Sequence, residues 1–323
     1  MMNILVVLED KSGSIHRMSQ EAIAGAQQIG GECNLSIGIL ALGNNAPALA
    51  EQAAKYEATE VLSMENEHLN QYTADGYAAA VAQVIANENP QYVFFGHTYQ
   101  IRDYVPRISV KLQRPFLNDV VSCSTNEGKP VFSKQAFNAK LLAGLHPQGS
   151  GPVLVSFQSA TFSSDNIQNG TANVRSVTVE MDTGTIKTVP EEPFQEAAGG
   201  VDLSSADLIV AIGRGIGKEE NIPMAQELAK VMGAEIASSR PVVDSDWLAP
   251  HHQIGSSGQT VAPKLYLALG ISGAIQHVVG MKGSKNIVVV NKDPDAPIFE
   301  LADYGVVGDM LEIVPKLTAA LQE

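Results

Sequence analysis

The sequence predicts an α/β protein with two domains: an N-terminal α/β domain with a mainly parallel sheet plus antiparallel strands, and a C-terminal doubly wound domain. The chain has 323 residues, more than one hydrophobic core usually serves. Short aliphatic runs alternate with helix-period segments, as in parallel sheets with crossover helices. The stretch 191–200 is acidic, contains proline and ends in glycines. We therefore expect a first domain at 1–190, a linker at 191–200 and a second domain at 201–323.

Composition and charge exclude several classes of protein. Hydrophobic residues make up 45% and charged residues 17%, as is typical of globular chains. The formal net charge is -14 and no lysine or arginine run stands out, which disfavours binding to nucleic acid. The acidity is explained either by solubility or by a field that selects protein partners.

The two cysteines and the N-terminus bear on metal sites and location. Cys33 and Cys123 are far apart and form no CxxC pair, so we expect reduced thiols and no zinc or iron–sulfur site. Met1 leads directly into a predicted strand, and no apolar run approaches ~18 residues. We expect a soluble cytoplasmic protein with no targeting segment and no membrane insertion.

Four β–α repeats open the chain and predict a parallel sheet with right-handed crossovers. His97 follows the fourth strand, with Arg102 and Arg107 nearby, and serves either an anion site or a structural, helix-capping or interface role. The predicted strands are Asn3–Val7, Leu35–Leu42, Glu60–Ser63 and Tyr92–Phe95, and the predicted helices are Ser14–Ile29, Pro47–Tyr56, Ala74–Ala86 and Ile101–Leu112.

After Pro115 the pattern changes to period-two alternation, which predicts an antiparallel addition to the sheet. Between these strands, Ser159–Asn173 is rich in Ser, Thr and Asn and is expected to be an exposed loop. The predicted strands are Asp119–Ser124, Pro130–Ala136, Ala139–Leu145, Val153–Phe157, Val174–Met181 and Thr185–Val189.

The second domain begins with a strand, a glycine turn and a helix, at Asp207–Ile212, 213–217 and Asn221–Met232. The turn GRGIG is not the GxGxxG dinucleotide fingerprint, because its third glycine comes one residue early. Further on, the strand Pro263–Leu269 is followed by the turn GISG and a helix bearing Ile275, Val278 and Val279. Such a helix start attracts phosphate.

The next strand, Asn286–Val290, is nearly all aliphatic and ends at the polar loop 291–294, where ligands of open α/β sheets bind. The segment 265–309, LYLALGISGAIQHVVGMKGSKNIVVVNKDPDAPIFELADYGVVGD, closely resembles the signature of the alpha subunit of electron-transfer flavoproteins. The resemblance extends back through Asp207–Arg214 and Ala237–Asp244 and is looser over residues 1–190. It implies a Rossmann-like FAD-binding domain at 201–323.

The resemblance assigns one group of residues to the phosphates and adenosine of FAD. Ser272, Gly273, Ala274, Ile275, Gln276 and His277 would wrap the pyrophosphate and ribityl chain. Arg214 would add a positive charge there, although as a turn residue it could equally be solvated. Asn291 and Asp309 would address the adenosine end, and Asp309 is also a natural N-cap for a helix at Met310–Leu321.

A second group is assigned to the isoalloxazine ring. Ser239 and Arg240 would place a cation over the ring, and His277 would face its C2 carbonyl, both favouring a negatively charged reduced flavin. A helix histidine with a bond into the core is the alternative for His277. Ile254, Gly255, Ser256 and Ser257 would run along the flavin, with Ser257 near N5, where relatives often carry threonine.

The preceding segment departs from the family pattern at Trp247 and at the pair His251-His252. Two adjacent histidines can bind a metal, but side chains next to each other on a strand point oppositely and no third ligand is evident, so no metal site is expected.

No acid–base pair or activated nucleophile accompanies the predicted site, which indicates an electron carrier rather than an enzyme. The resemblance implies a heterodimer with a beta subunit that carries AMP. It also implies electron transfer from flavin dehydrogenases, such as the acyl-CoA dehydrogenases of fatty acid oxidation, to a membrane quinone oxidoreductase. A bifurcating heterodimer with a second FAD in the beta subunit stays open. The alternatives from other classes are an NAD-dependent dehydrogenase and a nucleotide-sensing binding module.

Overall fold

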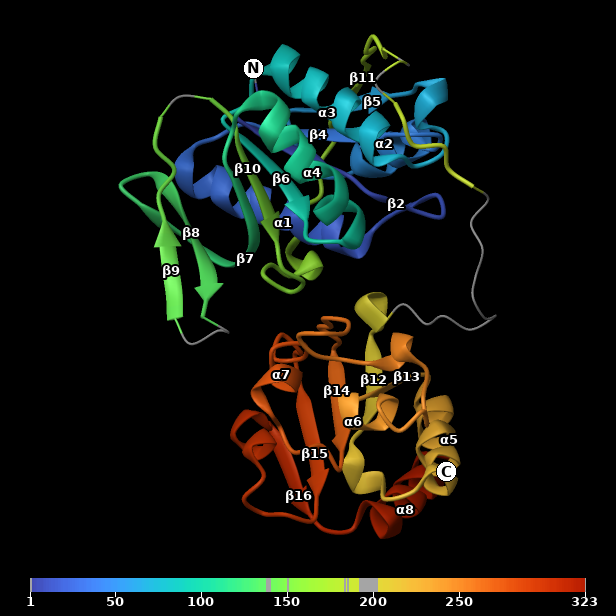
Figure 1. Ribbon diagram of the computed structural model, residues 1–323. Coiled ribbons are helices and arrows are strands. Elements are labelled where there is room, and N and C mark those ends of the chain that lie inside the picture. Colours follow the sequence, from blue (N-terminus) through green and yellow to red (C-terminus); the bar gives the residue numbers. More distant parts are fainter. Residues whose placement is uncertain are drawn as a thin grey trace. The chain divides into compact units, whose positions relative to one another are not determined.

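A computed structural model describes residues 2–137, 141–149, 151–182, 184, 186–191 and 203–322. The chain divides into two compact units, Met1–Pro193 and Phe194–Glu323 (Figure 1). The linker expected at 191–200 lies outside the described residues from 192 onward. No helix within the described ranges is both long and apolar enough to cross a bilayer.

The first unit is built on a nine-stranded sheet with the order β11-β5-β4-β1-β6-β10-β7-β8-β9. The strands from β11 to β7 are parallel to their neighbours, and β8 and β9 are antiparallel. The strands are β1 (Ile4–Val7), β4 (Ile37–Leu42), β5 (Glu60–Met64), β6 (Tyr92–Gly96), β7 (Phe116–Asn126), β8 (Lys129–Ala136), β9 (Leu141–Leu145), β10 (Val153–Phe157) and β11 (Asn173–Ser176). A small hairpin, β2 (Asp10–Lys11) and β3 (Ser14–Ile15), follows β1.

Helices cover both faces of this sheet, which explains the aliphatic composition of its central strands. Ile4 and Val6 of β1 pack in the core beneath α1 (Arg17–Cys33) and α2 (Ala46–Ala53). Leu5 and Val7 lie in the opposite core, beneath α3 (Ala74–Glu88) and α4 (Tyr99–Leu112). Successive strand residues therefore supply two separate hydrophobic layers.

Two strands of this unit contradict the expected antiparallel addition. β10 lies between β6 and β7 and is parallel to both, and β11 is parallel to β5. All five residues of β10 are buried, and four of them are apolar, with Ser156 the exception. This composition is typical of a central parallel strand. Among the described strands of the nine-stranded sheet, antiparallel pairing is confined to β7, β8 and β9.

Two further expectations in this unit are wrong. Residues 186–189 form no strand; instead Asp75 accepts hydrogen bonds from the Lys187 N–H at 3.3 Å and the Thr188 hydroxyl at 3.0 Å. The stretch Ser159–Asn173 is not exposed throughout, because Phe162 is buried and stacks edge-on against Phe157 at 5.0 Å.

The second unit contains five parallel strands in the order β13-β12-β14-β15-β16, which confirms the doubly wound prediction. The chain starts at β12, moves to β13 on one side and then returns to β14 on the other. The point between β12 and β14 is the topological switch point, where ligands of such sheets bind. The strands are β12 (Leu208–Ile212), β13 (Glu235–Ser238), β14 (Leu265–Leu269), β15 (Ile287–Asn291) and β16 (Tyr304–Val307).

The two faces of the second sheet are covered differently. Val210 and Leu267 lie in the core beneath α5 (Ile222–Met232) and α8 (Met310–Gln322). The opposite face, with Tyr266, is covered by loops, by α7 (Ile275–Val278) and by the short helix η8 (Pro297–Leu301). α7 is one turn long and contains Ile275 and Val278 of the expected helix, with Val279 as its C-cap residue. Just beyond it, the carbonyl of Gly280 accepts from the Val261 N–H at 2.7 Å and joins the chain to a neighbouring loop.

Candidate functional site

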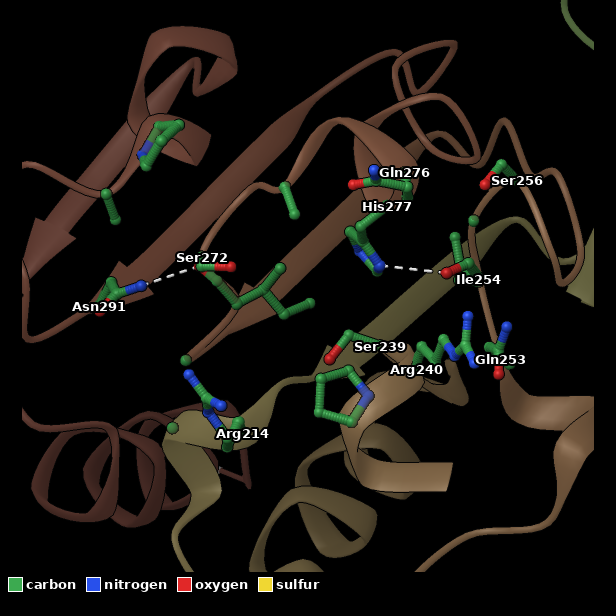
Figure 2. Close-up of a pocket in the computed structure, with 18 of the residues that line it drawn as sticks. Arg214, Ser239, Arg240, Gln253, Ile254, Ser256, Ser272, Gln276, His277 and Asn291 are labelled. Atoms are coloured by element: carbon green, nitrogen blue, oxygen red, sulfur yellow. Dashed lines mark hydrogen bonds between the residues drawn. The ribbon is translucent and has the colours of Figure 1, made fainter. Parts of the chain in front are cut away.

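A cavity of about 630 Å³ opens in the second unit at the carboxyl ends of β12, β13, β14 and β15 (Figure 2). Its position is the switch point of the sheet, and its volume lies within the ~300–1,000 Å³ typical of small-molecule sites. Each strand contributes the loop that follows it, so segments far apart in sequence meet around one space. The strand order therefore explains why this pocket forms here.

Most residues singled out from the sequence line this cavity: Arg214, Ser239, Arg240, Ile254, Gly255, Ser256, Ser257, Ser272, Ala274, Gln276, His277 and Asn291. The sequence reasoning missed other lining residues, namely Gly215, Pro241, Gln253, Gly270, Ile271, Asp293, Ala296 and Pro297. Nearly all of these lie beside predicted residues in the same loops. The resemblance thus identified the loops of the cavity but not every residue in them.

The charges around the cavity differ from those of the chain as a whole. The charged side chains of its lining are Arg214, Arg240 and Asp293, a net positive set in a chain of formal charge -14. Arg214 follows β12, and Arg240 begins α6 (Arg240–Val243) directly after β13. Two guanidinium groups beside strand-end backbone suit a dianionic pyrophosphate or another electron-rich group.

The loop 254–257 is held against the chain around α7. The Ser256 N–H donates to the Gln276 carbonyl at 2.7 Å. Gly255 has φ +141°, and a Cβ there would lie 2.7 Å from the same carbonyl oxygen, so glycine is required by both conformation and space. The hydroxyl of Ser257 accepts from Gln253 Nε2 at 2.9 Å. These contacts fix the path of the backbone along one wall of the cavity.

The turn after β14 is fixed from two sides. Asn291 Nδ2 donates to the Ile271 carbonyl at 2.8 Å (Figure 2). The Ile298 N–H donates to the Ser272 carbonyl at 3.2 Å. Gly273 itself packs against Ile298 and does not line the cavity, and Ile275 is 61% exposed. Because α7 is one turn long, its dipole is small, and attraction for an anion would depend on loop N–H groups and the arginines.

His277 lies at the cavity with only 6% of its surface exposed. Its Nδ1 is 3.1 Å from the Ile254 carbonyl oxygen, and its Nε2 is 2.9 Å from the Tyr266 hydroxyl. Burial lowers the pKa of His277 to about 4, partly offset by the Ile254 carbonyl. The alternative of a helix histidine bonded into the core therefore describes its contacts, and a contact with the flavin C2 carbonyl stays a prediction.

Asp309 lies outside the cavity lining and caps α8. Its Oδ1 accepts from the Leu311 N–H at 2.9 Å, and its Oδ2 is 2.9 Å from Lys292 Nζ. The hydrogen bond from Lys292 is the main cause that lowers the pKa of Asp309. The capping role proposed from the sequence is confirmed, whereas its contact with adenosine stays a prediction.

The other histidines singled out from the sequence have local partners. His97 Nδ1 lies 2.8 Å from the Ser156 hydroxyl, and burial lowers the pKa of His97. His252 Nδ1 is 2.8 Å from the Ile236 carbonyl. In the part of the chain that the structure describes, no three His, Cys, Asp or Glu side chains are grouped to hold a metal.

Comparison with known proteins identifies the family of the chain. The profile described as "Electron transfer flavoprotein domain" matches residues 4–182, and "Electron transfer flavoprotein FAD-binding domain" matches 202–282. The electron transfer flavoprotein subunit alpha of Bacillus subtilis (strain 168) is 39% identical across 99% of this chain and 97% of that protein. The chain belongs to the electron-transfer flavoprotein family.

Two further relatives cover nearly the whole chain. Protein FixB of Clostridium saccharobutylicum is 33% identical over 99% of this chain and 96% of its own length. The subunit LctC of the lactate dehydrogenase (NAD(+),ferredoxin) of Acetobacterium woodii is 29% identical over 99% of this chain and 77% of that protein.

Family membership decides between the classes left open by the sequence. The cofactor of the second unit is FAD, and the protein is an electron carrier without substrate chemistry of its own. Proteins of this family pair with a beta subunit, in which AMP is a standard feature, and work with dehydrogenases. The alternatives of an NAD-dependent dehydrogenase and of a sensing module are therefore rejected.

Proposed function

We propose that this chain, paired with its beta subunit in the cytoplasm, holds one FAD in the cavity of its second unit. There the FAD would receive electrons from flavin dehydrogenases, such as the acyl-CoA dehydrogenases of fatty acid oxidation, for delivery to a membrane quinone oxidoreductase. The proposal rests chiefly on one observation: the cavity at the switch point carries two arginines and lies largely in the part matched by the FAD-binding profile. A net positive lining in an acidic chain favours an anionic cofactor.

The residues divide between the two ends of the cofactor. Arg214 and the loop 272–277 would hold the pyrophosphate and ribityl chain, with Gly273 allowing the turn and Ile275 at its outer side. Asn291, at the end of β15, would address the adenosine end, and Asp309 would reach it from the start of α8. When bound, FAD supplies the one- and two-electron chemistry.

The ring end would be formed by the segments after β13. Ser239 and Arg240 start α6 at the rim of the cavity, where the guanidinium would lie over the isoalloxazine and favour added electron density. Ile254, Gly255, Ser256 and Ser257 form the wall along the ring. The Ser257 hydroxyl accepts from Gln253, so its own proton would be available for donation to N5.

The test is co-expression with the beta subunit. The purified heterodimer is expected to be yellow, to release FAD on denaturation, and to be reduced by an acyl-CoA dehydrogenase with its substrate and reoxidised by the quinone oxidoreductase. The variant Arg214→Ala is expected to retain less FAD, whereas Arg175→Ala, an arginine of the first unit that pairs with Glu60 and Glu88, is expected to retain it fully.

A colourless, correctly folded wild-type heterodimer would contradict the proposal. If the heterodimer contained two FAD and its flavin were reduced by NADH, the protein would instead belong to the electron-transfer flavoproteins that bifurcate electrons.

A further inference from the structure

Tyr266 is a buried tyrosine, the second residue of β14, whose hydroxyl contacts a residue of the cavity lining. The residue is 0% exposed, and burial raises the pKa of its phenol well above the usual value. Its hydroxyl oxygen lies 2.9 Å from His277 Nε2. On the other side of the ring, His277 Nδ1 lies 3.1 Å from the Ile254 carbonyl oxygen (Figure 2). A strand, a short helix and a loop are thus linked through one imidazole.

For a neutral imidazole, the chemistry of the three groups allows one arrangement of protons. A carbonyl oxygen only accepts, so the proton of the imidazole must be on Nδ1 for the bond to Ile254. Nε2 then carries a lone pair and accepts from the Tyr266 hydroxyl, which remains protonated because its pKa is raised. With both bonds in place, neither nitrogen of the neutral ring donates into the cavity.

We propose that Tyr266 is a positioning residue of the flavin site, whose hydroxyl holds His277 as the neutral Nδ1–H tautomer against the Ile254 carbonyl. This inference rests on the proposed function for its meaning, because the imidazole lines the cavity assigned to FAD. Tyr266 itself is not in the cavity lining and acts through His277.

The Tyr266 hydroxyl opposes protonation of His277. A hydrogen bond to the neutral form of a base disfavours its charged form. Protonation of Nε2 would also force the phenol to accept, leaving its own proton without a partner in a buried site. Burial acts in the same direction, and the charged groups that share the cavity are Arg214, Arg240 and Asp293. The positive charge beside the flavin then comes from the arginines and does not vary with pH near neutrality.

Replacement of Tyr266 by phenylalanine tests this directly. Tyr266→Phe keeps the ring in the core and removes the hydroxyl, so Nε2 is left without its donor. The pKa of His277 is expected to rise by about one unit, a tenfold change in proton affinity. The contribution that titration of His277 makes to the pH dependence of the flavin potential is then expected about one pH unit higher in the variant than in the wild type, in which the pKa of His277 is about 4.

The measurement uses the heterodimer with FAD and with ¹⁵N-labelled histidine in this chain. The ring ¹⁵N shifts of His277, identified by their loss in His277→Asn, report which nitrogen is protonated and how the ring titrates. The matched control is Tyr304→Phe, which removes the same hydroxyl from a tyrosine that is 71% exposed on β16. It is expected to leave the shifts, the titration and the potential unchanged, and thermal unfolding verifies that each variant is folded.

Two outcomes would overturn the inference: a wild-type His277 protonated on Nε2, or a Tyr266→Phe variant whose ring shifts, titration and potential match the wild type. Both outcomes can be distinguished from a failure of the proposed function, because in that case the wild-type heterodimer would contain no FAD. The ring shifts of the flavin-free protein would still test the contact between Tyr266 and His277 in that case.

Discussion

Arg240 carries its charge at the rim of the cavity on a side chain that is 67% exposed. Its Nε lies 3.2 Å from Asp244 Oδ2, four residues further along the chain. Exposed pairs of this kind contribute only about 0–1 kcal/mol to stability. The guanidinium can therefore leave Asp244 for a ligand at small cost, which suits a group that is to act on a cofactor.

We predict that Arg240→Ala lowers the flavin potential of the heterodimer, because a cation near the ring favours the reduced form. A shift of about 30 mV would correspond to ~1.4 kcal/mol for a two-electron couple. The measurement is a redox titration against dyes of known potential. Asp244→Asn is the control, since it removes the paired carboxylate and keeps the cation, and its potential should be equal to or above that of the wild type. Equal potentials for Arg240→Ala and the wild type would remove this role from Arg240.

At the residue scale, the sequence was informative where a side chain follows a strand. Arg214, Arg240 and Asn291 were assigned through the resemblance to electron-transfer flavoproteins, and their positions agree with it, because the carboxyl ends of parallel strands meet at one edge of a sheet. Tyr266 was missed because a tyrosine inside an aliphatic strand is indistinguishable from ordinary core. Its role depends on the path of the turn that returns His277 over the strand, and no local pattern encodes that path.

The turn between β14 and α7 is shaped by close contact with another element. Gly273 has φ +86°, and a Cβ placed there would lie 2.3 Å from the backbone nitrogen of Ile298, just inside η8. Backbone atoms cannot move aside as a flexible side chain can. Gly273 thus allows two loops of the cavity wall to pack against each other, and this packing fixes the position of Ser272.

We predict that Gly273→Ala destabilises the protein by about 1–3 kcal/mol and weakens FAD retention, since the turn must shift to relieve the clash. Gly217→Ala is the matched control. The φ of Gly217 is similar, +79°, but a Cβ there meets nothing within 4 Å. This variant therefore introduces the backbone strain of an alanine at positive φ without a steric clash. Thermal unfolding and the flavin content of the purified heterodimer measure both effects. If the two variants were equally stable and equally yellow, contact with Ile298 would not be what fixes this turn.

At the element scale, the presence of strands and helices was predicted better than their partners. In the second unit, the strands expected at Asp207–Ile212, Pro263–Leu269 and Asn286–Val290 are present as β12, β14 and β15 of the parallel sheet. The directions of β10 and β11 were not predicted correctly, because side-chain alternation indicates burial and not whether a neighbour runs parallel or antiparallel. The helix expected at Ile275, Val278 and Val279 is present as α7, with Val279 as its C-cap residue.

On the scale of the whole molecule, the chain has two units with separate hydrophobic cores. Leu154 of β10 is fully buried in the first unit, and Leu267 of β14 is 3% exposed in the second. The lining of the proposed FAD cavity belongs entirely to the second unit. Binding of FAD should therefore stabilise one unit directly, by an amount set by its concentration relative to the dissociation constant.

We predict that calorimetry of the full chain resolves two transitions. Leu154→Ala and Leu267→Ala each create a buried cavity and should each destabilise one core by about 2–5 kcal/mol, so each variant is expected to lower a different transition. Added FAD should raise the transition that Leu267→Ala lowers, by about 2.7 kcal/mol at a hundred times the dissociation constant, and leave the other in place. A single transition, lowered by both variants and raised as a whole by FAD, would instead mean that the two cores unfold as one cooperative unit.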